Sequence, residues 1–173
     1  MIHQKRIAVV VPCFNEERQI LRVIESMPIQ VDAIVIIDDA STDGTVNVVE
    51  KASQRDPRIT LLRHSVNQGV GAAIASGYKF ARDQNYEIAV VMAGDGQMAP
   101  EDFVPVVDPV ARGEVDYAKG NRLVTHGAFK QMPTSRFLGN AVLSLLTKIA
   151  SGYWHIADSQ SGYTALGRTA LHT

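Results

Sequence analysis

The chain alternates between short apolar runs and longer segments in which apolar residues recur at helical spacing. Four of the runs are rich in Val, Ile, Leu and Ala and cover residues 7–11, 33–37, 59–63 and 88–92. Continuous apolar runs of this length are typical of strands that are buried on both faces of a sheet. A fifth strand is predicted within residues 115–122.

The segments between these runs predict helices. The first has Asn15 as its predicted N-cap, two acids in its first turn, and apolar residues at helical spacing from Ile20 to Met27. The other predicted helices fall within residues 41–54, 67–83, 100–113 and 140–149. Regular alternation of strand and helix predicts an α/β fold, with a mostly parallel central sheet and helices on both faces. We expect one domain over residues 1–173.

Polar side chains gather where the predicted strands end. Asn15 and Glu16 follow the first strand, Asp38 and Asp39 the second, Asp95 the fourth, and Asn121 and Arg122 the fifth. In open α/β sheets, ligands bind in the crevice outside the carboxyl ends of the strands. These ends are therefore where we expect the functional site.

The acid pair Asp38-Asp39 directly follows an apolar strand, where two unpaired carboxylates would be costly to bury. Such a pair can accept hydrogen bonds from a ribose hydroxyl or from an N–H group of a base. Loop solvation and helix capping explain the following residues, 41–44, better than they explain the pair. We therefore favour a binding role for Asp38 and Asp39.

The turn after the first strand, "PCFNEE", contains no glycine, which excludes the dinucleotide-binding fingerprint at this position. A Walker A loop is also absent, and "NQGVGAA" matches only part of a fingerprint. A bound nucleotide would then need a metal ion to bridge its diphosphate, and Mg²⁺ and Mn²⁺ prefer oxygen ligands. Asp95 lies between two glycines and is placed for this role, although an ordinary turn aspartate explains it equally well.

Composition narrows the class of protein. The 173 residues are 46% hydrophobic and 20% charged with a formal net charge of −1, which fits a globular domain and offers no basic excess for nucleic acid. Cys13 is the single cysteine, so no internal disulfide can form; it is interpreted as a structural thiol in a reducing compartment.

No apolar run approaches the roughly 18 residues of a membrane span. We expect a cytoplasmic protein, with the cytoplasmic face of a membrane as an open alternative. The end at "GRTALHT" leaves open that the chain is a fragment.

Six segments occur in the order "VVPCFNEE", "VIIDDASTDGT", "NQGVGAAIASG", "VVMAGDGQMAPE", "AKGNR" and "DSQSGYTAL". Together they resemble the inverting family 2 glycosyltransferases with a GT-A fold, in particular the dolichyl- or polyprenyl-phosphate mannosyl- and glucosyltransferase branch. The resemblance runs from Val9 to Leu166. It implies a GT-A fold with a Rossmann-like half that binds a nucleotide.

The resemblance also implies a nucleotide pocket. The family's P-x-Y-N-E segment lines this pocket, and here Phe14 replaces the usual Tyr. Asp39, with Asp38 beside it, matches an acid that contacts the base or the ribose. The implied nucleotide-binding residues are Pro12, Phe14, Asn15, Glu16, Asp38, Asp39 and Asp95.

The metal-binding motif of the family is typically Asp-x-Asp-x-Gln, and residues 93–97 have Ala-Gly-Asp-Gly-Gln in its place. Asp95 and Gln97 are retained, whereas Ala93 replaces the first Asp. The resemblance therefore implies Mg²⁺ or Mn²⁺ at Asp95 and Gln97, with donor diphosphate and water completing the shell. The loss of one carboxylate predicts a metal site that is weak without the nucleotide.

The implied catalytic residues are Asp95, Arg122, Arg136 and Asp158. The two arginines match residues that bind donor or acceptor phosphates in the lipid-phosphate branch. Asp158 matches an acid near the acceptor and is our candidate general base for a hydroxyl acceptor. A lipid phosphate is already ionised and needs no strong base.

The implied enzyme moves a hexose from a UDP- or GDP-sugar to an acceptor, polyprenyl phosphate in this branch, by one in-line displacement with inversion. A nucleotide-sugar-binding module without turnover remains a second hypothesis, because Ala93 removes a carboxylate. A nucleotidyltransferase is disfavoured, since it would need a basic, glycine-rich loop where "PCFNEE" stands. The apolar face of residues 137–149 fits either packing on the sheet or peripheral membrane contact.

Overall fold

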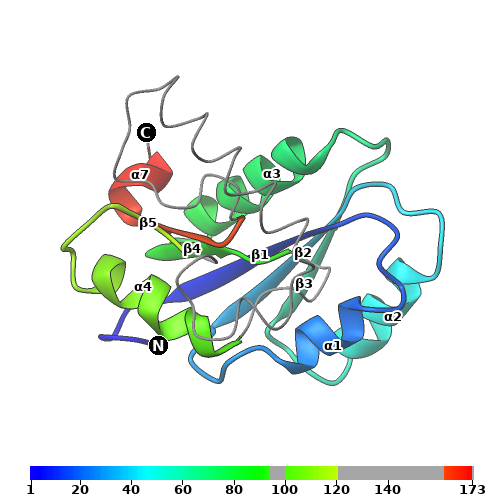
Figure 1. The fold of residues 1–173 in the computed structure, drawn as a ribbon. Coiled ribbons are helices and arrows are strands. Elements are labelled where there is room, and N and C mark those ends of the chain that lie inside the picture. The colour runs from blue at the N-terminus through cyan, green and yellow to red at the C-terminus, as the bar shows by residue number, and fades with distance from the viewer. Residues whose placement is uncertain (94–99, 121–161, 173) are drawn as a thin grey trace, which may run out of the picture. The chain divides into compact units, whose positions relative to one another are not determined.

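The computed structural model describes residues 1–93, 100–120 and 162–172 of the chain. Within them, six strands form one sheet in the order β3-β2-β1-β4-β6-β5 (Figure 1). The strands are β1 (Ile7–Cys13), β2 (Ala33–Asp38), β3 (Ile59–Arg63), β4 (Ile88–Val91), β5 (Tyr117–Lys119) and β6 (Thr164–Gly167). Two compact units divide the chain, residues 1–118 with 163–173 and residues 119–162. The first unit holds the sheet up to Ala118 and the helices that the structure describes.

The centre of the sheet is parallel, as predicted. β1 pairs in parallel with β2 on one side and with β4 on the other, and β3 continues the parallel order beyond β2. The pairing places Cys13 opposite Asp38, so the carboxyl ends of β1 and β2 lie level. The chain thus turns to opposite sides of β1, which creates the kind of switch point where open α/β sheets bind ligands.

Strand β6 was not predicted, and it is antiparallel to β4. Its residues Thr164–Gly167 contain only two apolar side chains, Ala165 and Leu166, so they lack the apolar run that predicted the other strands. Pairing with β4 along its whole length is what makes this short segment a strand. The antiparallel strand leaves the prediction of a mostly parallel sheet intact.

The helices cover both faces of the sheet (Figure 1). They are α1 (Ile20–Glu25), α2 (Thr45–Ser53), α3 (Val70–Asp83), the 3₁₀ turn η1 (Pro100–Asp102), α4 (Phe103–Ala111) and α7 (Arg168–His172). One core cluster joins the sheet to α1, α2 and α4, and a second joins it to α3 and α7. The residues of β1 from Ile7 to Val11 are fully buried, because both faces of this strand are covered.

Helix α3 lies very close to the central strand. A Cβ atom added to Gly77 would stand 2.1 Å from Cγ1 of Val10. Only a residue without a side chain allows this approach, which sets the distance between α3 and β1. The amino end of α3 is thereby positioned beside the carboxyl ends of the strands.

The first helix begins later than predicted. Asn15 is not its N-cap: α1 starts at Ile20, and Asn15 has a φ of 58° in the left-handed region that Asn tolerates. The segment from Asn15 to Gln19 instead forms a loop whose polar groups bind the loop after β2. Tertiary hydrogen bonds therefore replace the expected first helical turn.

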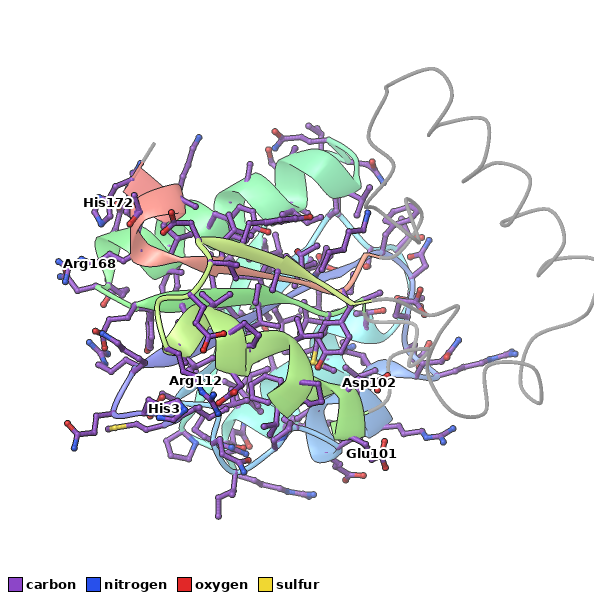
Figure 2. The ribbon with its side chains drawn as sticks, turned by 60° about the vertical axis from the view of Figure 1, so that its left-hand side comes forward. His3, Glu101, Asp102, Arg112, Arg168 and His172 are labelled. Atoms are coloured by element: carbon purple, nitrogen blue, oxygen red, sulfur yellow. The ribbon has the colours of Figure 1, made fainter. Side chains whose placement is uncertain are left out.

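The N-terminal segment is bound to α4 on the side of the sheet shown in Figure 2. His3 Nε2 lies 2.9 Å from Asp108 Oδ1, and Arg112 pairs with the other oxygen of Asp108 at 2.9 Å.

Among the residues that the structure describes, no helix is long and apolar enough to cross a membrane.

Candidate functional site

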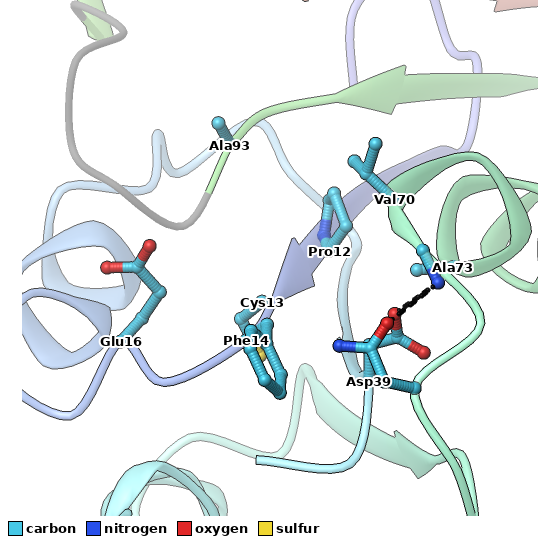
Figure 3. A pocket seen from close by; sticks show the side chains of 10 residues that line it. Pro12, Cys13, Phe14, Glu16, Asp39, Val70, Ala73 and Ala93 are labelled. Atoms are coloured by element: carbon cyan, nitrogen blue, oxygen red, sulfur yellow. Dashed lines mark hydrogen bonds between the residues drawn. The ribbon is translucent and has the colours of Figure 1, made fainter.

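A cavity of about 350 Å³ opens at the carboxyl ends of β1 and β2 and beside the start of α3 (Figure 3). Its described lining consists of Pro12, Cys13, Phe14, Glu16, Asp39, Asn67, Gly69, Val70, Ala73 and Ala93. Four of the seven predicted nucleotide-binding residues belong to this set: Pro12, Phe14, Glu16 and Asp39. Asn15 and Asp38 do not line the cavity, and their different positions are described below.

Asp39 is held in the cavity wall by several hydrogen bonds. It is only 3% exposed, and three donors hold its carboxylate: Oδ1 lies 2.7 Å from His64 Nδ1 and 2.9 Å from the Gln68 N–H, and Oδ2 lies 2.7 Å from the Gly69 N–H. Burial alone would raise the pKa of Asp39, but the hydrogen bonds from Gln68, His64 and Gly69 outweigh it and hold that pKa below its usual value. Asp39 is therefore an ionised acceptor at neutral pH.

His64 connects Asp39 to helix α3. Its ring is 11% exposed, its Nε2 lies 2.9 Å from Ser76 Oγ, and its backbone N–H donates to the carbonyl of Asp38 at 2.9 Å. His64 was not among the site residues predicted from the sequence. The available signal was its position directly after β3, at the same edge of the sheet as Asp39.

Asp38 and Asp39 are adjacent but have different surroundings. Asp38 is 1% exposed, and its Oδ2 accepts the Ser41 N–H at 3.3 Å. Its Oδ1 has no hydrogen-bond partner within the described part of the chain. Asp38 therefore contacts the loop that follows β2, and the expected ligand contact by this residue stays a prediction.

Asn15 ties the loop after β1 to the loop after β2. Its backbone N–H donates to Ser41 Oγ at 2.9 Å, and its side-chain Oδ1 accepts the Thr42 N–H at 2.8 Å. This reciprocal pair satisfies backbone groups of both loops. Asn15 thus supports the site and does not line it.

Three further hydrogen bonds extend this connection to the start of α2. The Glu17 N–H donates to Asp43 Oδ2 at 3.2 Å, and Glu17 Oε2 accepts the Gly44 N–H at 3.1 Å. The Glu16 N–H donates to Thr45 Oγ1 at 2.8 Å. We name residues 14–19 and 39–45 the paired loops. Since Phe14, Glu16 and Asp39 all lie in them, the paired loops place three lining residues together.

Cys13 lines the cavity as an unreactive group. Burial, reinforced by the nearby carboxylates of Asp38 and Glu16, raises the pKa of its thiol to about 12. The thiol lies 3.5 Å from the carbonyl oxygen of Ile37 and donates to it. This environment confirms the interpretation of Cys13 as a structural thiol.

Comparison with known proteins identifies the family. The sequence model of glycosyl transferase family 2 matches residues 8–173. The chain belongs to glycosyl transferase family 2. This confirms the resemblance inferred from the six segments.

The family 2 chain has several named relatives. It is 32% identical to UDP-N-acetylglucosamine–dolichyl-phosphate N-acetylglucosaminyltransferase of Methanococcus voltae, over 96% of this chain and 71% of that protein. It is 30% identical to polyprenol monophosphomannose synthase of Mycolicibacterium smegmatis, over 96% of this chain and 63% of that protein. The chain thus spans about two thirds of the length of these relatives.

A solved structure shares the fold of the family 2 chain. Glucosyl-3-phosphoglycerate synthase from Mycobacterium tuberculosis, in complex with Mn²⁺, UDP and glucosyl-3-phosphoglycerate, superposes with a TM-score of 0.70 at 23% identity, covering 96% of this chain and 58% of that one. At this identity the likeness concerns the fold. It confirms the predicted α/β architecture of the GT-A type.

The remaining predicted site residues of this family 2 chain lie outside the described residues. They are Asp95, Gln97, Arg122, Arg136 and Asp158. Ala93, which takes the place of the first Asp of the family's metal motif, does lie in the described part and lines the cavity. No group of three His, Cys, Asp or Glu side chains suited to a metal ion occurs among the described residues. The metal ligands and catalytic roles stay predictions.

Proposed function

We propose that this chain binds a nucleoside-diphosphate sugar and forms the donor-binding part of an inverting glycosyltransferase. The donor is a UDP- or GDP-sugar, and the acceptor is a polyprenyl phosphate at the cytoplasmic face of a membrane. The observation that carries the proposal is Asp39, an ionised acceptor held by three donors on the wall of a cavity at the strand ends. An ionised carboxylate of this kind can accept a hydrogen bond from an N–H group of a base.

Two comparisons support the donor and the acceptor. The name of the Methanococcus voltae relative gives a UDP-sugar as donor and dolichyl phosphate as acceptor, and the Mycolicibacterium smegmatis relative is named for a polyprenol monophosphomannose product. The structural neighbour holds UDP with Mn²⁺. Phe14, which is 46% exposed at the cavity, offers a ring against which a base can stack.

The charges of the cavity fit a divalent cation. Its described lining carries Glu16 and Asp39 but neither Lys nor Arg, so a diphosphate that enters needs positive charge from elsewhere. Asp95 and Gln97 would hold Mg²⁺ or Mn²⁺, which supplies charge neutralisation for the leaving diphosphate. Carboxylate and amide oxygens are suitable donors for either ion.

The proposed reaction is a single displacement. The acceptor oxygen forms a bond to the anomeric carbon while the bond from that carbon to the diphosphate oxygen breaks, which inverts the configuration. Asp39 and Phe14 hold the base, and Arg122 and Arg136 bind phosphate groups. With a lipid phosphate as acceptor, Asp158 positions groups; with a hydroxyl acceptor, it takes up the proton.

We expect that Asp95→Asn abolishes most transfer, lowering the rate by about 100-fold or more, because removal of a charge-stabilising group at a reacting centre costs this much. The measurement is transfer from UDP- and GDP-sugars to polyprenyl phosphate in vesicles, with and without Mn²⁺. Asp83→Asn, at an exposed side chain of α3, is the matched control and should leave the rate unchanged.

A second candidate function is a binding module without turnover, favoured by Ala93 in the cavity wall where the family has a carboxylate. Calorimetry separates the candidates. Binding of UDP or GDP without transfer to any acceptor would support the module. If neither nucleotide binds with or without Mn²⁺, both candidates fail.

A further inference from the structure

The carboxylate of Asp39 has little capacity left for a ligand. An ionised carboxylate offers about four acceptor sites, two on each oxygen. His64 Nδ1 and the Gln68 N–H both occupy Oδ1, while the Gly69 N–H occupies Oδ2. With respect to the described residues, about one acceptor site therefore remains, and it is on Oδ2. Figure 3 shows Asp39 on the α3 side of the cavity, opposite Phe14 and Cys13.

His64 occupies one acceptor site of Asp39 Oδ1 whether its ring is neutral or protonated. Because an ionised carboxylate only accepts, Nδ1 must carry the hydrogen that points to Asp39. Nε2 then accepts from the Ser76 hydroxyl when the ring is neutral and donates to it when the ring is protonated. The Ser76 hydroxyl holds the ring at Nε2, and the His64 backbone N–H is bonded to the carbonyl of Asp38. These contacts fix the ring, and the bond from Nδ1 then fixes the plane of the Asp39 carboxylate.

Bases differ in the number of donors that they present to such a group. Uracil has one N–H, at N3, between two carbonyl groups. Guanine has two adjacent donors, at N1 and N2, which match both oxygens of a carboxylate. A guanine bound at Asp39 would leave one donor unsatisfied in a buried place, and this is costly.

We propose that His64 is a specificity-determining positioning residue: by occupying Oδ1 of Asp39 and fixing the carboxylate plane, it leaves a single acceptor that selects uracil over guanine. The donor is accordingly a UDP-sugar. This inference rests on the proposed binding of a nucleotide in the cavity. Without His64, only the adjacent Gln68 and Gly69 N–H groups hold Asp39, and the carboxylate can turn to present both oxygens.

The first test uses the unaltered chain and three nucleotides. Calorimetry in the presence of Mn²⁺ should give UDP an affinity at least about tenfold higher than that of GDP, and a similar margin over N3-methyl-UDP, which lacks the single N–H donor. Equal or tighter binding of GDP would overturn the inference and leave the proposed function standing. Equal binding of N3-methyl-UDP would show that no imide N–H is recognised, and would also overturn the inference.

The second test compares two variants of His64. His64→Asn keeps an N–H donor close to the place of Nδ1 and should retain the preference for UDP. His64→Leu removes the donor and should reduce the ratio of UDP to GDP affinity to within about threefold, as expected for the loss of a hydrogen bond to a charged group. Thermal unfolding of both variants shows whether they fold.

The outcomes separate the two proposals. A folded His64→Leu that keeps the full preference overturns the role of His64. If His64→Leu does not fold, the comparison of UDP with GDP and N3-methyl-UDP on the unaltered chain still decides whether Asp39 offers one acceptor. If the unaltered chain binds neither UDP nor GDP, the proposed function itself fails and the inference fails with it.

Discussion

At the scale of single residues, Asp38 and Asp39 are adjacent in the sequence but have different roles, because β2 ends at Asp38 and Asp39 lies in the loop that follows. Asp39 lines the cavity as an anchored acceptor, whereas Asp38 accepts the Ser41 N–H in the loop that follows β2. The sequence predicted that the pair mattered, since two acids after an apolar strand need partners. It could not assign the two roles, because these depend on where His64 and residues 68–69 fall in the folded sheet.

Cys13 provides a prediction at this scale. Its pKa of about 12 means that the thiol stays protonated in the folded protein at pH 8, and only the thiolate reacts with iodoacetamide. We expect negligible labelling of the native chain and rapid labelling in denaturant, measured by mass spectrometry. Rapid labelling under native conditions would contradict the structural role.

At the scale of elements, the paired loops are held by side chains that bind backbone groups. Glu17→Gln should weaken the bond to the Gly44 N–H and destabilise the fold by about 0.5–1.5 kcal/mol. Hydrogen exchange at the Gly44 amide measures the local effect, and urea unfolding measures the global one. Glu25→Gln, on the exposed side of α1, is the control and should change neither.

The contact of α3 with β1 gives a second prediction for elements. Gly77→Ala would force a methyl group into Val10 and should destabilise the fold by about 1–3 kcal/mol, the usual cost of overpacking. Gly71→Ala lies on the same helix, and no described atom stands within 4 Å of its added Cβ. It should be neutral or stabilising by up to about 1 kcal/mol. Equal effects of the two variants in urea unfolding would refute the close packing.

Elements were predicted well where they are long and buried. The four apolar runs became β1 to β4. Strands β1, β2 and β4 are buried along almost their whole length and need apolar residues at nearly every position, whereas the edge strand β3 is only partly buried. β6 was missed, since its pairing with the neighbouring strands β4 and β5, and not an apolar run, defines it. The start of α1 was misplaced because Asn15 and Glu17 have better partners in the loop after β2 than in a helical turn.

At the scale of the whole molecule, stability should fall in acid. Hydrogen bonds from the Arg58 side chain lower the pKa of Asp56, and those from the Arg6 backbone and Lys5 lower the pKa of Glu87. Carboxylates with lowered pKa stabilise the fold above their unfolded pKa, and this contribution is lost as the pH falls through the folded pKa. Burial raises the pKa of Asp102, which opposes the trend.

We therefore expect the melting temperature to be highest near neutral pH and to fall below about pH 4. Calorimetric scans at a series of pH values measure this. Asp56→Asn should flatten the dependence, since it removes one of the shifted groups. A melting temperature that rises on acidification would contradict the assignment of these carboxylates.

The partners of Asp39 have a consequence for the order in which the protein is made. His64, Gln68 and Gly69 lie 25, 29 and 30 residues after it in the chain. A nascent chain that has released β1 and β2 but not residues 64–69 carries Glu16 and Asp39 but none of the three donors that hold the Asp39 carboxylate. The carboxylate of Asp39 is therefore anchored only after the connection from β3 to α3 has left the ribosome.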